Sequence, residues 1–167
     1  MKLISLLEKL EYTCLQGSTD QEVKNVIYDS RKVEEGSLFI CIRGAVVDGH
    51  KFVPDVVAKG AKVLIVEEAV EAPEDVTVIL VKDTRYAMAF ISAAYFGYPA
   101  EKLKTIGITG TKGKTTTTYM VKSILENAGY KVGLIGTIEA IIGDKVIPAK
   151  NTTCLLYTSP SHETTLH

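Results

Sequence analysis

The amino-acid sequence predicts an α/β protein, in which a small N-terminal α/β domain is followed by the truncated start of a parallel-sheet domain of the P-loop type. Two observations predict this class. β-Branched runs of strand length alternate with segments whose apolar residues recur at helical spacing. A glycine-punctuated turn also lies between a strand pattern and an amphipathic helix. The length of 167 residues, 46% of them hydrophobic, allows a real core.

Strand and helix patterns alternate in the N-terminal part. The first residues predict a short amphipathic helix, because Glu8 and Glu11 interrupt what would otherwise be an apolar leader. Gly60 can stop a helix, and Asp83 or Thr84 can cap the next one. The expected strands cover 26–28, 37–42, 62–66 and 76–81, and the expected helices cover 52–57 and 84–95.

A second α/β pattern begins near Lys104. Its expected elements are a strand over 105–109, a turn over 110–114, a helix over 115–128 and a strand over 131–138. The apolar face of the helix consists of Met120, Val121, Ile124, Leu125 and Ala128. Together these elements make one βαβ unit, whereas a doubly wound nucleotide-binding domain needs several more strands. The sequence therefore predicts only the beginning of such a domain.

Composition excludes several classes of protein. The chain has 19 Lys and Arg against 20 Asp and Glu, so a basic nucleic-acid-binding surface is not expected. No apolar stretch reaches the roughly 18 residues of a membrane span. The three cysteines form no C-x-x-C pair, which is typical of a reducing compartment, and Cys41 is expected to be buried. We therefore expect a cytoplasmic monomer with neither nucleic acid nor membrane as a partner.

The turn that begins at Gly110 gives the strongest functional signal. Between a strand and a helix, such a turn directs backbone N–H groups and the positive helix end at phosphate oxygens. Lys114 can reach the terminal phosphates, and the Thr115 hydroxyl can ligate Mg²⁺. The spacing G-x-x-G-K-T-T departs from the general P-loop pattern, because Ile108 stands where that pattern has its first glycine. The residues predicted to bind nucleotide phosphate are Gly110, Thr111, Lys112, Gly113, Lys114, Thr115 and Thr116.

Three further polar segments are ambiguous when each is taken alone. In Asp29-Ser30-Arg31 the serine could donate to a ligand carbonyl, although an Asx- or Ser-type turn is the more frequent outcome. The segment 44–49 could be an ordinary turn, and His50 is expected at the surface or at a helix start, not as a ligand. Asn151-Thr152-Thr153 predicts a loop whose hydroxyl and amide groups are available to a phosphate or sugar.

Taken together, these motifs resemble the Mur ligase family. The family's ATP loop reads Gly-Thr-Asn-Gly-Lys-Thr-Thr, and only Lys112 differs from it, so the shortened spacing is what the family shows. Asp29-Ser30-Arg31, the turn at 36–39, and Gly44 with Asp48-Gly49 resemble its UDP-binding domain. The stretches 133–138 and 151–153 are similar to the branch that adds a diamino acid. The resemblance runs over about residues 1 to 153.

The resemblance implies an ATP-dependent amide ligase of peptidoglycan synthesis. Such enzymes phosphorylate the D-Glu carboxylate of UDP-MurNAc-L-Ala-D-Glu, and the amine of a diamino acid then displaces phosphate from the acyl phosphate. Lys114 would be catalytic, because its charge and that of Mg²⁺ on Thr115 would neutralise the transferring phosphoryl group. Carried over by position, the contacts to the UDP-muramyl substrate would come from Tyr28, Ser30, Ala45, Val46, Val47, Asn151, Thr152 and Thr153.

Two other functions stay open. One is a MurF-type ligase or another Mur superfamily enzyme; MurF shares the Asp-Ser-Arg domain but typically has serine at the position of Thr111. The other is a stand-alone nucleotide-binding module without ligase activity, which predicts a complete sheet after the phosphate loop.

The sequence departs from the family after Thr153. The family continues with Pro-Glu, whereas Cys154-Leu155 stands here, and the remaining residues show no clear period. We therefore expect 154–167 to be a non-native or disordered tail and the chain to be an inactive fragment. The expected domains are a UDP-substrate-binding domain over 1–103 and the beginning of a central ATP-binding domain over 104–153.

Overall fold

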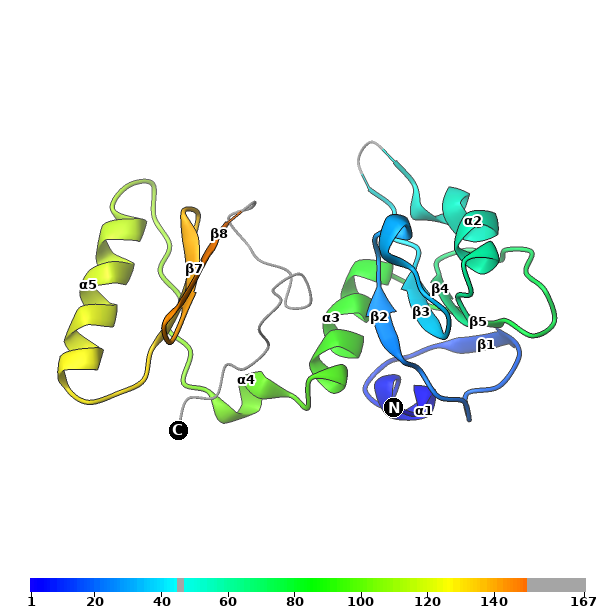
Figure 1. Ribbon diagram of the computed structural model, residues 1–167, viewed down its shortest axis with the longest axis horizontal. Coiled ribbons are helices and arrows are strands. Elements are labelled where there is room, and N and C mark those ends of the chain that lie inside the picture. The colour runs from blue at the N-terminus through cyan, green and yellow to red at the C-terminus, as the bar shows by residue number, and fades with distance from the viewer. Residues whose placement is uncertain (45–46, 150–167) are drawn as a thin grey trace. The chain divides into compact units, whose positions relative to one another are not determined.

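The computed structural model describes residues 1–44 and 47–149. The chain forms two compact units, of which the first runs from Met1 to Tyr95 and the second begins at Phe96. Each unit has a sheet of its own (Figure 1).

The first unit contains a five-stranded, mostly parallel sheet. Its strands are β1 (Thr13–Gln16), β2 (Asn25–Ile27), β3 (Ser37–Ile40), β4 (Val63–Val66) and β5 (Thr77–Leu80). Their order is β1-β5-β4-β3-β2; the last four are parallel, and β1 pairs antiparallel with β5 at one edge. The carboxyl ends of β2 to β5 therefore meet along one side of the sheet, where open α/β sheets bind their ligands.

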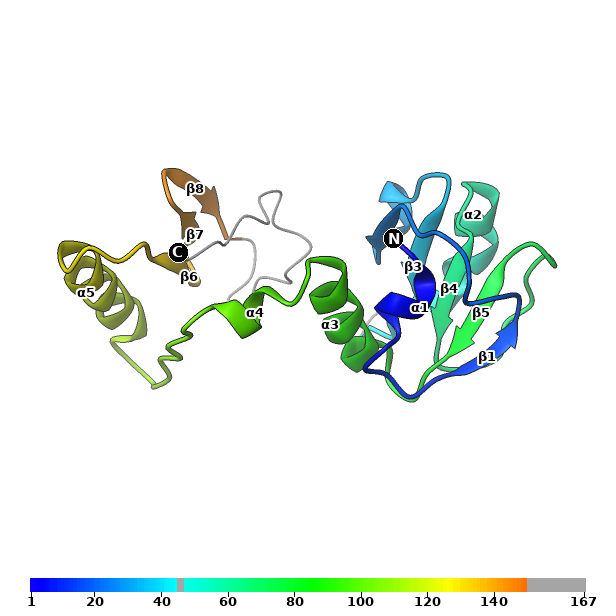
Figure 2. The ribbon, with the colours of Figure 1, turned by 90° about the horizontal axis from the view of Figure 1, so that it is seen from below.

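Helices cover both faces of this sheet (Figure 2). They are α1 (Leu3–Leu6), α2 (Val53–Ala58) and α3 (Thr84–Tyr95), with short 3-10 helices η1 (Ser30–Lys32) and η2 (Gly49–Phe52). Side chains alternate along β3, so Phe39 joins a cluster with Val56 of α2 while Leu38 faces the opposite side. On that side α1 packs against α3. Strand β4 is buried along its whole length, as expected for the centre of a parallel sheet.

Helix boundaries in this unit follow the signals in the sequence. Helix α3 begins where predicted, because Asp83 Oδ1 accepts from the backbone amides of Arg85 and Tyr86 at 2.8 and 3.0 Å. Gly60, with φ of +98°, follows α2, and its amide donates to the carbonyl of Val57. The α/β class and the four predicted strands of this unit are therefore confirmed, whereas β1 was not predicted, because its side chains are mostly exposed and show no alternation.

The second unit is built differently from the prediction. Its elements are α4 (Pro99–Lys102), α5 (Lys114–Asn127), β6 (Gly133–Ile135), β7 (Glu139–Ile142) and β8 (Lys145–Pro148). The three strands form an antiparallel sheet in the order β6-β7-β8. The Tyr119 hydroxyl of α5 hydrogen-bonds the Glu139 carboxylate of β7. No helix in the described part of the chain is long and apolar enough to cross a bilayer.

The prediction of a βαβ unit here was wrong. Residues 105–109 are not a strand, and of 131–138 only 133–135 are, paired antiparallel with β7. A parallel strand needs a hydrogen-bonded neighbour, and the described residues of this unit supply none for 105–109. The predicted apolar face of α5 is not buried either: Met120 and Ile124 are more than 60% exposed.

Candidate functional site

The carboxyl edge of the first sheet brings together segments that are distant in the sequence. Tyr28 and Ser30 follow β2, and the loop that contains Val47 follows β3, its parallel neighbour. Tyr28 and Ser30 are half-buried and Val47 is half-exposed. The structure thus places these three predicted contacts at neighbouring strand ends. Ala45 and Val46, and likewise Asn151, Thr152 and Thr153, lie outside the described residues.

Asp29 shapes the turn that carries Ser30. Its Oδ1 accepts from the backbone amide of Arg31 at 3.1 Å, which is an Asx-type turn at the start of η1. The carboxylate also forms two hydrogen bonds with the Arg31 guanidinium, at 2.8 and 2.9 Å. That side-chain contact is the main reason why the pKa of Asp29 falls to about 2. Asp29 therefore holds the turn, and Ser30 is left as the member of the motif suited to a ligand.

The loop after β3 is closed by contacts between its two ends. Arg43 and Asp48 form an isolated antiparallel bridge, and the amide of Gly44 donates to the carbonyl of Val47 at 2.9 Å. Arg43 Nε also donates to Asp48 Oδ2 at 3.1 Å. We name residues 43–48 the β3 loop. Its described residues are thus tied at the base by backbone and side-chain contacts together.

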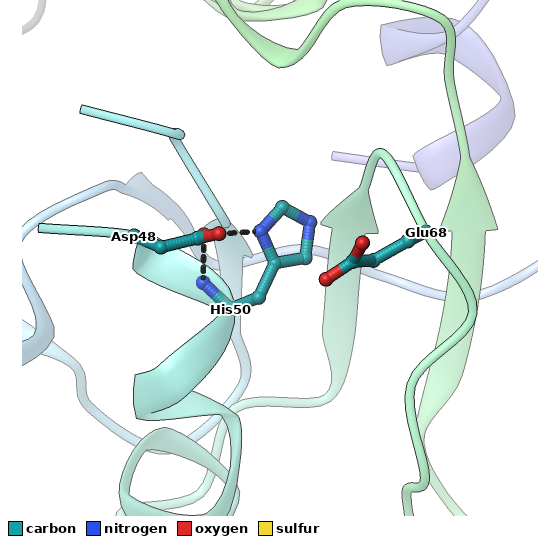
Figure 3. Close-up of side chains that lie close together, drawn as sticks. All are labelled: Asp48, His50 and Glu68. Carbon is teal, nitrogen blue, oxygen red and sulfur yellow. Dashed lines mark hydrogen bonds and ion pairs between the residues drawn. The ribbon is translucent and has the colours of Figure 1, made fainter. Parts of the chain in front are cut away.

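His50 connects the β3 loop to the end of β4 (Figure 3). Asp48 Oδ1 lies 2.6 Å from His50 Nδ1 and also accepts from the His50 amide at 3.0 Å. On the other side of the ring, the backbone amide of Glu67 donates to Nε2 at 3.0 Å. A backbone amide can only donate, so Nε2 is the acceptor and Nδ1 carries the proton that points at Asp48. This assigns one tautomer to the ring.

The network continues from Glu67 into the start of α3. Glu67 Oε1 accepts from the Thr84 amide at 2.8 Å and from the Thr84 hydroxyl at 2.7 Å. Thr84 is fully buried, so these bonds satisfy polar groups that would otherwise be costly to bury. The ends of β3, β4 and β5 are therefore connected through Asp48, His50, Glu67 and Thr84.

Arg43 balances the negative charge at this edge. Its guanidinium contacts Asp48 and, through Nη2, the Glu68 carboxylate at 3.0 Å. The backbone amide and the ring of His50, together with Arg43, lower the pKa of Asp48 to about 2. Asp48 is therefore a carboxylate across the physiological range of pH.

Asp48, His50 and Glu68 could be mistaken for a metal centre. Their ligand atoms lie within 4.8 Å of one another, and Figure 3 shows the Glu68 side chain extending toward the ring. Both ring nitrogens of His50 are already engaged, however, and Arg43 contacts both carboxylates. A cation would have to displace all of these contacts, so the donor set does not fit a resident metal.

The predicted phosphate loop precedes α5 in the second unit. Gly110 and Gly113 have φ values of +149° and +78°, which residues other than glycine rarely adopt. Helix α5 begins at Lys114 directly after Gly113, which has no side chain to cap it, so the first-turn amides can face an anion. The loop residues are exposed, apart from the half-buried Thr115.

Lys114 folds back onto its own loop. Its ammonium donates to the carbonyl of Gly110 at 2.6 Å, which places the charge beside the open helix end. The Thr118 hydroxyl in the next turn donates to the Lys114 carbonyl at 2.5 Å. The loop thus brings a cation, glycine backbone and a helix N-terminus together, a combination suited to phosphate oxygens.

Sequence reasoning missed the polar network of the first unit. His50 lies at a helix start, as one of the two expectations had it, and it is only 8% exposed. No sequence signal grouped Arg43, Glu67 and Thr84. Any two of them are separated by 17 to 41 positions in the chain, and only the folded sheet brings them to the same edge. The adjacency of Asp48 and His50, an aspartate two residues before a histidine at a helix start, was the one local signal available.

Two family models match this chain. The model described as the Mur ligase family catalytic domain matches residues 22–96, and the model described as the Mur ligase middle domain matches residues 108–162. The chain belongs to the Mur ligase family. The resemblance drawn from the phosphate loop and from Asp29-Ser30-Arg31 is therefore confirmed.

Relatives of this Mur ligase chain include two clostridial proteins. The UDP-N-acetylmuramoyl-L-alanyl-D-glutamate--2,6-diaminopimelate ligase of Clostridium perfringens is 53% identical over 153 residues, which cover 92% of this chain and 32% of that protein. The protein of the same name from Clostridium tetani is 48% identical over 156 residues, with the same shares. The chain spans about a third of the length of the curated relatives it matches.

Solved Mur ligase structures share the fold. A crystal structure of MurF from Acinetobacter baumannii is 33% identical, with a TM-score of 0.62, over 82% of this chain and 28% of that one. A structure of a UDP-N-acetylmuramoyl-L-alanyl-D-glutamate--2,6-diaminopimelate ligase gives a TM-score of 0.69 at 22% identity, and the match covers 95% of this chain and 32% of that one.

Proposed function

We propose that this chain carries the UDP-binding and ATP-binding parts of a ligase that joins 2,6-diaminopimelate to UDP-MurNAc-L-Ala-D-Glu. The clostridial relatives, which are named for this activity, are 53% and 48% identical. The solved structures do not separate the two enzymes, since MurF is 33% identical and the solved diaminopimelate ligase is 22% identical, so the choice rests on the clostridial relatives. The described residues after the phosphate loop form a three-stranded antiparallel sheet, which does not support a stand-alone nucleotide-binding module.

The observation that carries the proposal is the arrangement at the carboxyl edge of the first sheet. Tyr28, Ser30 and Val47 come from two adjacent parallel strand ends, which is where an open α/β sheet binds a nucleotide. The Ser30 hydroxyl is suited to hydrogen-bond a uracil carbonyl. Ala45, Val46 and the segment 151–153 are proposed as further contacts of the UDP-muramyl substrate.

ATP is proposed to bind at the loop from Gly110 to Thr116. The glycine conformations, the open start of α5 and the Lys114 ammonium fit a chain of phosphates. The Thr115 hydroxyl fits one ligand position of Mg²⁺, which when bound would supply charge neutralisation at the phosphates. Lys114 is proposed as the catalytic residue, because its charge would oppose the charge that develops during phosphoryl transfer.

The cellular setting is also a proposal. We propose a monomer located in the cytoplasm, with small molecules as its substrates and with neither nucleic acid nor membrane as a partner. The net charge of −1 supports the part of this proposal that concerns nucleic acid.

Calorimetric titration of the full chain with UDP tests the substrate site. We expect saturable binding, weakened about three- to tenfold by Ser30→Ala through loss of one hydrogen bond to the ligand. Ser5→Ala, at an exposed serine of α1, is the matched control and should bind as the parent chain does. No binding of UDP by the folded parent chain, or equal affinities for both variants, would contradict the assignment.

A further inference from the structure

We propose that His50 is a positioning residue for the UDP site, and that it acts by holding Asp48 and thereby the base of the β3 loop. This inference rests on the proposed function, because it assumes that the β3 loop contacts UDP. His50 has no expected contact with the ligand itself. Its role would be to keep Asp48 and the adjacent Val47 at a set place relative to the end of β4 before the nucleotide arrives.

The burial of His50 makes its two hydrogen bonds important. A buried imidazole needs partners for both nitrogens, and here one partner is the Asp48 carboxylate while the other is the Glu67 amide. The ring is rigid, so these two bonds fix the separation between Asp48 and the end of β4. Glu67 is held in turn by the fully buried Thr84. Besides the contacts between its own two ends, the base of the β3 loop is therefore also connected to the core.

Asp48 passes this constraint on to the β3 loop. It closes the loop against Arg43 through the backbone bridge and through the contact with Arg43 Nε at 3.1 Å. The Gly44 amide and the Val47 carbonyl then pair at 2.9 Å just inside the closure. A shift of Asp48 would move Val47, which is next to it in the chain and is one of the proposed UDP contacts.

Two substitutions of His50 each keep one of the two hydrogen bonds of the imidazole ring and remove the other. In His50→Asn the side-chain amide can occupy the place of Nδ1 and still donate to Asp48, but it cannot reach the Glu67 amide. In His50→Gln the carbonyl can occupy the place of Nε2 and accept from Glu67, but no donor faces Asp48. Both variants lose ring volume, so both are expected to lower Tm. They form a matched pair that differs in whether Asp48 keeps a hydrogen bond from the side chain at position 50; the Arg43 and backbone-amide contacts of Asp48 remain in both.

UDP titration and amide exchange of the full-length variants test the inference. We expect His50→Gln to bind UDP about three- to tenfold more weakly than His50→Asn, whatever their order in Tm. Amide exchange without ligand should be faster at Gly44 and Gly49 in His50→Gln than in His50→Asn. UDP affinities that follow Tm alone, with equal exchange at these two glycines, would overturn the positioning role and leave His50 as a stability residue.

Failure of this inference can be told apart from failure of the proposed function. If the parent chain does not bind UDP, the proposed function is wrong, while the exchange at Gly44 and Gly49 still shows whether His50 orders the loop. If the parent binds UDP and both variants bind equally with equal exchange, only the positioning role is wrong.

A surface variant covers the case in which both His50 variants fail to fold. Arg43 is half-exposed, so Arg43→Gln should fold, and it removes the second contact that closes the loop on Asp48. We expect weaker binding of UDP and of uridine by the same factor, about threefold, with Lys51→Gln on η2 as the charge-matched control. Weaker binding of UDP with unchanged binding of uridine would show that Arg43 contacts the phosphates, and it would overturn the positioning role of this closure. Unchanged affinity for both ligands would overturn that role as well.

Discussion

Gly49 lies against the backbone of Ile42, and its amide donates to the Ile42 carbonyl at 2.9 Å. A Cβ at this position would stand 2.7 Å from the Ile42 nitrogen and 2.8 Å from its carbonyl oxygen. Only glycine permits this approach, because backbone atoms cannot move aside as the end of a side chain can. The contact joins the residue before the β3 loop to the residue after it, so it sets the distance between the two ends of the loop.

Gly49→Ala should therefore destabilise the chain and open the β3 loop. We expect a loss of about 2–3 kcal/mol in the free energy of unfolding, together with weaker UDP binding. Gly107→Ala is the control, since a Cβ there meets nothing within 4 Å, and it should change stability by less than about 0.5 kcal/mol. Urea unfolding of the two variants checks the difference, and equal stabilities would show that the backbone adapts at Gly49.

Lys114→Met should weaken ATP binding by about tenfold or more, because it removes the cation at the open start of α5. Titration of the full chain with ATP and Mg²⁺ measures the effect. Lys145→Met on β8 removes the same charge from an exposed strand and should leave the affinity unchanged. An equal loss in both variants would point to net charge as the cause, and no loss in Lys114→Met would remove Lys114 from the site.

Stability should fall as the pH drops from about 4 to about 2. The pKa of Asp48 is about 2 in the folded chain against 3.8 as its ordinary value, so the folded state favours the carboxylate. The stabilisation is present above pH 3.8 and is lost as the pH falls through the folded pKa. Asp48→Asn should flatten this dependence by about 1–2 kcal/mol, as measured by urea unfolding at pH 2 to 5. Asp144→Asn is the control, and an unchanged slope in Asp48→Asn would refute the assignment.

Cys41 should resist alkylation in the native chain. It is fully buried, and burial raises the pKa of its thiol to about 12, so little reactive thiolate is present at neutral pH. Cys14 is exposed and should react with iodoacetamide before Cys41. Peptide mass spectrometry after a short exposure checks the order, and urea should make Cys41 reactive. Modification of Cys41 at the rate of Cys14 without urea would mean that the end of β3 is open in solution.

Local pattern was sufficient for much of the first unit. The apolar runs at β3 and β4, the Asp83 cap of α3 and the glycine stop after α2 are short-range signals, and each specified its element. Residues 105–109 also contain β-branched residues in a strand-like run, but they form no strand. A strand forms only when it can hydrogen-bond to a neighbouring strand, and the sequence of the segment alone does not show whether that neighbour is present.

The sequence by itself determined the family of this chain, its α/β class and the glycine-rich turn before α5, because each rests on residues close together along the chain. Tertiary structure alone decided that Asp48, His50, Glu67 and Thr84 form one network across three strand ends. Parallel strands bring their carboxyl ends to one edge regardless of sequence distance, so residues far apart become neighbours only once the sheet has formed. The buried His50 is then satisfied on one side by Asp48, two residues before it, and on the other by the Glu67 amide, which no local pattern could have named.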